Sequence, residues 1–370
     1  MSRLKRSVIG GIVALLLGIM GCGEPGTGPG PGPTPVATIV LTPPSATLEI
    51  SQSITFTAEP RDAQGKPVTG RAVTWTSSNQ TVATVAAGVV TGIAVGQTTI
   101  SASTDGKVGT ASVTVVGSSP PAAPIYFEDR ADGGIYRINP DGTGLTFVVS
   151  GRAPALASTG NRLAFLCGLN LCTANTDGTN QVEITADGPY GRPAWSPTSS
   201  QIVSSRAGGD LWIMSQDGTS RIQLTSGFYD DAPAWSPDAA LILFERDLEG
   251  VGPELYTIHP DGSGITRTGA TRAIWGGAWS PDGRRIAHTV SFPTGMEIVV
   301  MNADGSGAVQ LTNNPPFNDL APSWSPHGKW IAFASNRAGT MDIHIMRSDG
   351  SDVRRLTSGG DYEGFPAWSR

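Results

Sequence analysis

Between residues 36 and 116 the hydrophobic residues form short runs in which every second position is apolar. Turn-forming residues interrupt the runs about every ten positions, so no run has the length or period of an ordinary helix. The alternating pairs are Ile39 and Leu41, Leu48 and Ile50, Ile54 and Phe56, Val73 and Trp75, Ile100 and Ala102, and Val113 and Val115. This alternation predicts short antiparallel strands, and we expect residues 36–116 to form a β-sandwich.

The second half of the chain repeats with a period of about 40 residues. An Asp-Gly pair recurs six times, and a marker close to Ala-Trp-Ser also recurs six times. The aspartates are Asp141, Asp177, Asp217, Asp261, Asp304 and Asp349, and the second marker is centred on Leu156, Trp195, Trp235, Trp279, Trp324 and Trp368. Each repeat holds four short apolar runs joined by tight turns, which is the content of one propeller blade. Six markers of each kind predict six blades.

The phase of the repeat predicts how the blades close into a ring. The first repeat begins at Ile125 with what is the second run of the other repeats, and the sequence ends on a lone first run around Trp368. That last strand can pair with the edge that the first blade leaves open. The predicted fold is therefore all-β: a β-sandwich at 36–116, a linker at 117–124, and a six-bladed β-propeller at 125–370 closed by the C-terminal strand.

The N-terminus has the pattern of a secretory signal. The basic residues Arg3, Lys5 and Arg6 precede an apolar run over residues 8–20. Thirteen residues at about 1.5 Å each are too short to cross about 30 Å of hydrocarbon as a helix, so this segment predicts a signal peptide over residues 1–21.

The signal ends in Ile-Met-Gly-Cys, which resembles the lipobox of bacterial lipoproteins. The resemblance implies that Cys22 is lipidated after cleavage and anchors the chain in a membrane. Gly23 follows where that family usually has Asp for inner-membrane retention, which implies an outer-membrane lipoprotein facing the periplasm or the cell surface. The alternative is an ordinary signal peptide with a cysteine nearby. Residues 22–35, rich in Gly and Pro, have no apolar content to bury and are expected to be a tether.

Composition agrees with a turn-rich β protein. The 370 residues include 48 glycines and 28 prolines, about a fifth of the chain, and both residue types disfavour long helices. Removing the signal leaves 22 basic against 31 acidic residues, a net charge of −9, because three of the 25 basic residues lie in the signal. An acidic chain is not expected to bind nucleic acid as its main role.

Two cysteines remain in an exported chain, where thiols can oxidise. Cys167 and Cys172 flank Gly168-Leu169-Asn170-Leu171, which we expect to be the turn between two strands. Facing positions across a hairpin can meet disulfide geometry, so a local disulfide is predicted. Two free buried thiols are the alternative.

Both halves also resemble known families. The stretch WTSSN…VATV…GVVTG resembles the group 2 bacterial immunoglobulin-like (BIG2) domains, which serve as spacers or adhesive modules. The repeat PAWSPDG…IAFxSxR…DIxxMxxDGS…RLT resembles the TolB-like, or WD40-like (PD40), β-propeller family over residues 125–370. Three positions depart from that pattern, namely Leu156, Gly277 and His327.

The recurring residues have structural interpretations. The tryptophans have the size and regular placement of packing between blades, with surface recognition as the alternative. The Asp-Gly pairs match hairpin turns in which Gly accepts a positive φ. They lack the spaced oxygen ligands of a calcium loop.

A binding surface is expected where the repeat varies. Just before each predicted inner strand the residues differ between blades, as packing alone would not require. The candidate mouth consists of Arg152, Tyr190, Arg192, Tyr229, Asp230, Asp231, Trp275, Asp319, Tyr362 and Glu363. Aromatic residues and Arg are enriched in interface hot spots. The alternative is a set of solvated loop residues.

The sequence offers little for catalysis. His259 and His327 fall in expected turns, and His288 and His344 fall in strands of different blades, so they predict no metal site and no shared base. Serine-hydrolase, zinc-protease and phosphate-loop motifs are absent from the sequence. We therefore expect a non-enzymatic, lipid-anchored scaffold that binds a protein or glycan partner without a cofactor, with the immunoglobulin-like domain as spacer. A propeller-type polysaccharide lyase or glycosidase of the envelope is the alternative.

Overall fold

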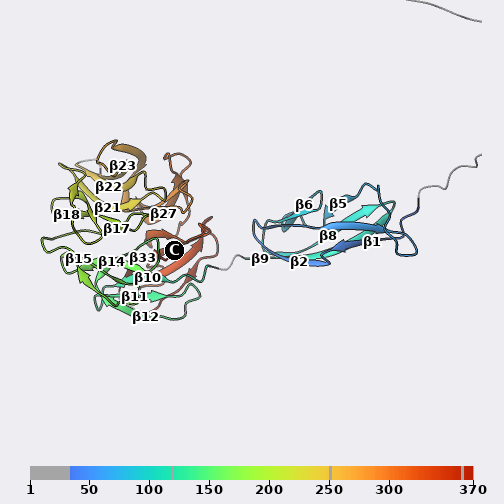
Figure 1. The fold of residues 1–370 in the computed structure, drawn as a ribbon, viewed down its shortest axis with the longest axis horizontal. Coiled ribbons are helices and arrows are strands. Elements are labelled where there is room, and N and C mark those ends of the chain that lie inside the picture. The colour runs from blue at the N-terminus through green and yellow to red at the C-terminus, as the bar shows by residue number, and fades with distance from the viewer. Residues whose placement is uncertain (1–33, 118–119, 250–251, 360–361, 370) are drawn as a thin grey trace, which may run out of the picture. The chain divides into compact units, whose positions relative to one another are not determined.

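The fold is given by a computed structural model that describes residues 34–117, 120–249, 252–359 and 362–369. These residues contain strands and turns but no α-helix, so the prediction of an all-β fold is confirmed, and no membrane-spanning helix is found among them. The chain divides into two compact units at residues 118 and 119 (Figure 1). The predicted signal peptide at 1–21, Cys22 and nearly all of the tether lie outside the described residues.

The first unit consists of nine strands in three sheets. The strands are β1 (Thr38–Thr42), β2 (Ser45–Glu49), β3 (Ser53–Thr55), β4 (Thr57–Arg61), β5 (Thr74–Ser77), β6 (Ala83–Ala86), β7 (Val89–Gly92), β8 (Gly96–Thr104) and β9 (Lys107–Val116). The sheet orders are β2-β9-β8-β5, β3-β7-β6 and β1-β4, and all pairs are antiparallel except β2 with β9. The alternating apolar residues, such as Ile100, Ala102 and Val113, point into one core, in which Phe56 and Leu48 are also buried.

The second unit contains six four-stranded antiparallel sheets. From the innermost strand outward they are β33 (Glu363–Trp368), β10 (Ile125–Asp129), β11 (Gly134–Ile138) and β12 (Thr146–Ser150); β13 (Arg152–Leu156), β14 (Arg162–Cys167), β15 (Asn170–Asn175) and β16 (Val182–Glu183); β17 (Ala194–Trp195), β18 (Gln201–Arg206), β19 (Asp210–Ser215) and β20 (Ile222–Gln223); β21 (Tyr229–Trp235), β22 (Ile242–Leu248), β23 (Gly252–Ile258) and β24 (Thr266–Thr271); β25 (Ala273–Trp279), β26 (Arg285–Phe292), β27 (Gly295–Asn302) and β28 (Val309–Gln310); and β29 (Asp319–Trp324), β30 (Trp330–Ser335), β31 (Asp342–Arg347) and β32 (Arg354–Arg355). We number these sheets one to six in this order.

Sheet one joins the two ends of the unit. Its innermost strand, β33, comes from the end of the chain and pairs antiparallel with β10, so that Trp368 lies opposite Ile125. The innermost strands of consecutive sheets are also in contact with one another, from β13 through β29 to β33. In Figure 1 the C-terminal strand therefore lies beside β10, near the start of the unit.

The repeated tryptophans are buried between sheets. Trp235 at the end of β21 packs against Val203 and Ile213 of sheet three and against Ile242 of its own sheet. Trp195, Trp279, Trp324 and Trp368 occupy the same place in the other clusters. A buried tryptophan removes 150–250 Å² from water, so these side chains are a large share of the contact between neighbouring sheets.

Two further repeated motifs fix the turns. In the Asp-Gly pair at Asp217, the carboxylate Oδ1 accepts the backbone N–H and the hydroxyl of Thr219, at 3.0 and 2.6 Å. Gly218 has a φ of 78°, and a Cβ there would lie 1.8 Å from the carbonyl oxygen of Ile184. Only glycine fits this turn. After the outermost strand, the hydroxyl oxygen of Thr225 accepts the backbone N–H of Leu211 at 3.0 Å, which ties the loop to its own sheet.

The hairpin between β14 and β15 carries a disulfide. Asn170 and Leu171 already pair with Cys167 and Leu166, so the turn is the two residues Gly168 and Leu169 instead of the four that we expected. Cys167 and Cys172 are consequently diagonal neighbours on one face of the hairpin and are not directly opposite. Their Cα atoms lie 5.8 Å apart, and their sulfur atoms are bonded.

Candidate functional site

A pocket lies where the six innermost strands meet. Each strand, or the residues just before it, contributes a short segment to the lining, and the cavity measures about 120 Å³. We call it the central pocket. Its segments are Ala153-Pro154, Arg192-Pro193, Ala232-Pro233, Trp275-Gly276-Gly277, Ala321-Pro322 and Phe365-Pro366.

The backbone that lines the central pocket is strained. Five of its non-glycine residues have positive φ values between 49° and 65°, and the pairing of these innermost strands with their neighbours shifts register there. They are Ala153, Ala232, Trp275, Ala321 and Phe365. Such a conformation costs on the order of 1–3 kcal/mol per residue and persists only where the surroundings enforce it. Strain of this kind is characteristic of ligand-binding sites.

Hydrogen bonds between neighbouring sheets hold these segments in place. Each comes from the same position of a second strand and reaches the innermost strand of the next sheet. Glu128 Oε2 accepts the N–H of Ala153 at 2.8 Å, and Glu245 Oε2 accepts the N–H of Gly276 at 2.9 Å. Thr289 Oγ1 accepts the N–H of Ala321 at 3.1 Å, whereas the hydroxyl of Ser205 donates to the carboxylate Oδ1 of Asp231 at 2.6 Å. Four of the six junctions are bridged in this way.

Three side chains from three different sheets meet at the central pocket. The guanidinium carbon of Arg192 lies 4.0 Å from the centre of the Phe365 ring and 5.2 Å from that of Trp275. Arg192 Nη1 donates a hydrogen bond to the backbone oxygen of Trp275 at 2.9 Å. The two rings are themselves 5.7 Å apart. The guanidinium thereby lies against two adjacent aromatic rings, a favourable cation–π arrangement.

Burial shifts the pKa values of two charged groups at the central pocket, Arg192 and Glu245. Burial lowers the pKa of Arg192, and the negative charges of Asp231 and Glu245 oppose that shift. Burial also raises the pKa of the Glu245 carboxyl to about 7, although the N–H of Gly276 and the charge of Arg192 favour its ionised form. A carboxyl that titrates near neutral pH beside a pocket is typical of functional sites.

Five of the ten predicted mouth residues lie at or near the central pocket. Arg192 and Trp275 line it. Asp231 lies close enough to raise the pKa of the exposed Tyr229 by its charge. Burial raises the pKa of Tyr362, whose ring lies 4.2 Å from the guanidinium of Arg130.

The other five predicted residues lie elsewhere. Asp230 is buried in a two-pronged ion pair with Arg246, at 2.6 and 2.8 Å. Asp319 is buried beside Arg337, at 2.7 Å, and Glu363 is buried and bonded to the hydroxyl of Thr357. These three carboxylates fasten loops. Arg152 is exposed in a separate depression, which Cys167 and Leu169 also line.

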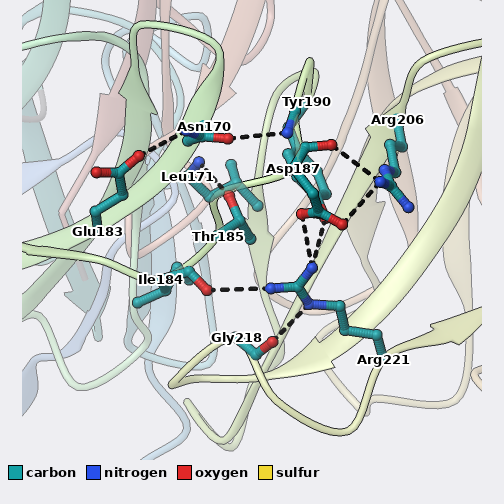
Figure 2. Close-up of polar contacts among 11 residues, drawn as sticks. Asn170, Leu171, Glu183, Ile184, Thr185, Asp187, Tyr190, Arg206, Gly218 and Arg221 are labelled. Carbon is teal, nitrogen blue, oxygen red and sulfur yellow. Dashed lines mark hydrogen bonds and ion pairs between the residues drawn. The ribbon is translucent and has the colours of Figure 1, made fainter.

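Tyr190 belongs to a polar cluster between sheets two and three (Figure 2). Its buried hydroxyl donates to Asp187 Oδ1 at 2.9 Å and accepts from Arg221 at 3.1 Å. Asp187 forms ion pairs with Arg206 and Arg221, both at 2.7 Å. With its hydroxyl engaged in this way, Tyr190 holds neighbouring loops together.

The sequence analysis missed Glu128, Glu245 and Phe365. The two glutamates follow an aromatic residue in the second strand, in Phe127-Glu128 and Phe244-Glu245. The other repeats have Leu166, Ser205, Thr289 and Ala334 at this position. Comparing the second strands with one another would have exposed both carboxylates as departures from the repeat.

The histidines are dispersed. His288 on β26 and His344 on β31 are buried, and burial lowers the pKa of His288 to about 4. Across the described ranges, no group of three or more His, Cys, Asp or Glu side chains is arranged to hold a metal ion.

Comparison with known proteins agrees with the two units. The family model of the group 2 bacterial Ig-like domain matches residues 35–115, and that of the TolB β-propeller domain matches residues 270–370. Over 71 residues the chain is 42% identical to the Tol-Pal system protein TolB of Anaeromyxobacter dehalogenans, and 41% identical to that of a second strain. These matches cover 19% of this chain, and the chain spans only 16% of the length of those relatives.

Solved structures show the likeness of fold at low sequence identity. TolB from Acinetobacter baumannii has a TM-score of 0.58 at 18% identity, with 83% of this chain and 84% of that chain covered. A chain of a nidogen/laminin complex has a TM-score of 0.54 at 12% identity, with 66% of this chain and 97% of that chain covered. The protein thus contains a group 2 bacterial Ig-like domain at residues 35–115 and a TolB β-propeller domain that includes residues 270–370.

Proposed function

We propose that the second unit is a closed six-bladed propeller that binds a protein or glycan partner in the cell envelope and catalyses no reaction. The observation that carries this proposal is the central pocket, to which all six sheets contribute and in which Arg192 lies against two aromatic rings. A polar group fixed in advance in an otherwise apolar pocket loses little freedom on binding, which favours recognition. The likeness to TolB, named for the Tol-Pal system, supports an envelope-associated scaffold.

The first unit and the N-terminus complete the proposal. Cys22 carries the lipid anchor, residues 22–35 are the tether, and the Ig-like domain at 36–116 is a spacer between the outer membrane and the propeller. Replacing Cys22 with Ser tests the anchor, because only the cysteine thiol can accept the first lipid. The wild-type protein should fractionate with membranes and the variant should not. Equal fractionation of both would contradict lipidation.

The central pocket can be tested as the binding surface in cells. A photo-crosslinking amino acid at Tyr229, which is 60% exposed near the pocket, should capture the partner. The same amino acid at Val182 is the matched control, because Val182 is 53% exposed on the outermost strand β16. The adduct at Tyr229 should disappear in the double variant Arg192→Ala/Trp275→Ala.

Two outcomes would contradict the proposal. Identical adducts from both positions, or adducts that persist in the double variant, would show that the partner binds elsewhere. Release of unsaturated or reducing sugars from envelope polysaccharide by the purified protein would show an enzyme.

A further inference from the structure

Arg192 is half-buried and differs from two other arginines of the second unit that are at least partly withdrawn from solvent. Arg246 donates two N–H groups to Asp230, and Arg337 donates to Asp319. Among the residues that the structure describes, Arg192 forms no ion pair and donates a single hydrogen bond, to the backbone oxygen of Trp275. A guanidinium has five N–H donors, so most of its donor capacity is unused. Arg192 is half-buried, so its remaining donors are open to an acceptor that enters the central pocket.

The carboxylates around Arg192 already have donors. Glu128 accepts from Arg130 at 2.7 Å and from Ala153. Asp231 accepts from the hydroxyl of Ser205 at 2.6 Å. Glu245 accepts from Gly276, and with a pKa of about 7 its carboxyl is largely protonated below neutral pH. Each of these carboxylates is held by a donor of the protein, whereas Arg192 has no carboxylate partner within the described parts of the chain, so the complement that Arg192 lacks is an acceptor.

The size of the pocket limits what the acceptor can be. About 120 Å³ is slightly less than the roughly 150 Å³ cavity that takes up one benzene molecule. The end of an aspartate or glutamate side chain fits this space, whereas a substituted uronic acid ring has about twice as many heavy atoms as benzene. The planar guanidinium, which lies against Trp275 and Phe365, matches a carboxylate through two parallel hydrogen bonds.

We propose that Arg192 is the anchor of the central pocket and binds a carboxylate of an acidic peptide segment of the partner. This inference rests on the proposed function and names the chemistry of the same site. Asp231 is the nearby negative charge that opposes such a ligand, so its removal should strengthen binding.

The test uses the full chain with its arginines labelled with ¹⁵N and observed by NMR. The Nε–H signal of Arg192 is assigned by its absence in Arg192→Lys. The probes are five-residue glycine peptides, acetylated and amidated, that carry a central Asp, Asn or Lys, together with free glucuronate. We expect the Asp peptide to shift the Arg192 signal with a Kd of about 1–10 mM, a plausible range for a single charge-assisted contact.

Variants decide whether Arg192 is responsible. Arg192→Lys should weaken binding of the Asp peptide at least about tenfold, because an ammonium cannot form the two-pronged contact. Asp231→Asn should strengthen it severalfold, and Arg152→Gln, which alters an exposed arginine outside the pocket, should leave it unchanged. Peptide binding to the lysine variant is followed by the fluorescence of Trp275, with Trp275→Phe to identify its contribution.

Several results would overturn the inference. Equal binding of the Asn or Lys peptide would show that Arg192 does not recognise the carboxylate. Tighter binding of glucuronate would show that the ligand of the site is an acidic sugar. Absence of any shift with the Asp peptide would also overturn it. If crosslinks at Tyr229 persist in cells while Arg192→Lys has no effect, only this inference fails and the proposed scaffold function stands.

Discussion

The two ends of the innermost strands differ in how strictly they keep the repeat. At one end, five of the six sheets carry a tryptophan, and all five are buried between sheets. At the other end, the residues that line the central pocket range from Ala153 to Arg192 and Phe365, and several have positive φ. The regular end supplies stability. At the irregular end the positive φ also recurs, in five of the six sheets, and it is the side chains that vary, with Arg192 left without an ion pair to any residue that the structure describes. Positions at which the residue varies from sheet to sheet are therefore the ones that can bind a partner.

The largest effect expected from this comparison is on stability. Trp235→Ala should lower the free energy of unfolding by about 3–5 kcal/mol, because it leaves a cavity between sheets three and four. Trp275→Ala should lower it by only about 1 kcal/mol, since Trp275 is half-buried. Urea denaturation of both variants measures the difference. Equal decreases in the free energy of unfolding would show that the two ends of the innermost strands contribute equally to stability.

A departure inside the regular region should make the protein sensitive to acid. His288 lies buried where four other sheets have Phe127, Phe165, Phe244 and Phe333, and burial lowers its pKa from 6.5 to about 4. Because the unfolded chain binds this proton first, stability should fall as the pH drops from about 6.5 toward 4. The loss corresponds to about 3 kcal/mol.

His288→Phe should remove this part of the acid dependence, as measured by urea denaturation between pH 7 and 4. The exposed His327→Gln is the matched control and should behave as the wild type does. A pH profile that His288→Phe leaves unchanged would rule out His288 as its cause.

The loop motif after the outermost strand should have a smaller effect. Thr225→Val removes the acceptor of the Leu211 N–H and should cost about 1–3 kcal/mol, because a buried donor is left unpaired. The exposed neighbour Ser226 changed to Ala should be close to neutral. Hydrogen exchange at Leu211 measures the local effect, and unchanged protection in Thr225→Val would contradict it.

The smallest expected effect concerns the irregular end. The Glu245 carboxyl faces Arg192, Asp231, Asp247 and Tyr229, and its pKa of about 7 makes it more negative as the pH rises from 6 to 8. Affinity for the Asp peptide should therefore fall about two- to threefold over that range. In Glu245→Gln the affinity should be independent of pH, because an amide does not titrate, and its oxygen can still accept from Gly276. If this variant keeps the pH dependence of the wild type, Glu245 is not its cause.

Much of the fold was predictable because it repeats. The fold is indicated by local signals that recur, namely the alternation in the first unit and the Asp-Gly turns and tryptophans of the second unit. A wrong assignment of one strand or turn is therefore corrected by the next repeat. The hairpin at Cys167 shows the limit of this approach, since the expected four-residue turn is a two-residue turn. The pairing of β14 with β15 extends to Cys167 and Asn170, and no local residue pattern predicted where it ends.

The candidate site was only partly predictable. We predicted the mouth from residues that lie just before the innermost strands. This criterion found Arg192 and Trp275, which line the central pocket. It also selected Asp230 and Asp319, which are buried in ion pairs with Arg246 and Arg337. Arg246 lies opposite Asp230 on the neighbouring strand β22, and Arg337 lies in the turn after β30; sequence position alone did not reveal either pairing. Glu245 lies within the second strand, outside the segments before the innermost strands from which the mouth was predicted, and its contact with Gly276 of the next sheet appears only in the structure.

The sequence by itself determined the all-β class, the two units and the repeated turns, because each depends on residues close together in the chain. The tertiary structure alone decided which charges are paired and which is left without a partner. Arg192, Trp275 and Phe365 are far apart in the sequence and meet only because three innermost strands converge. The balance of burial, aromatic contact and unfilled hydrogen bonds at Arg192 is a property of that convergence.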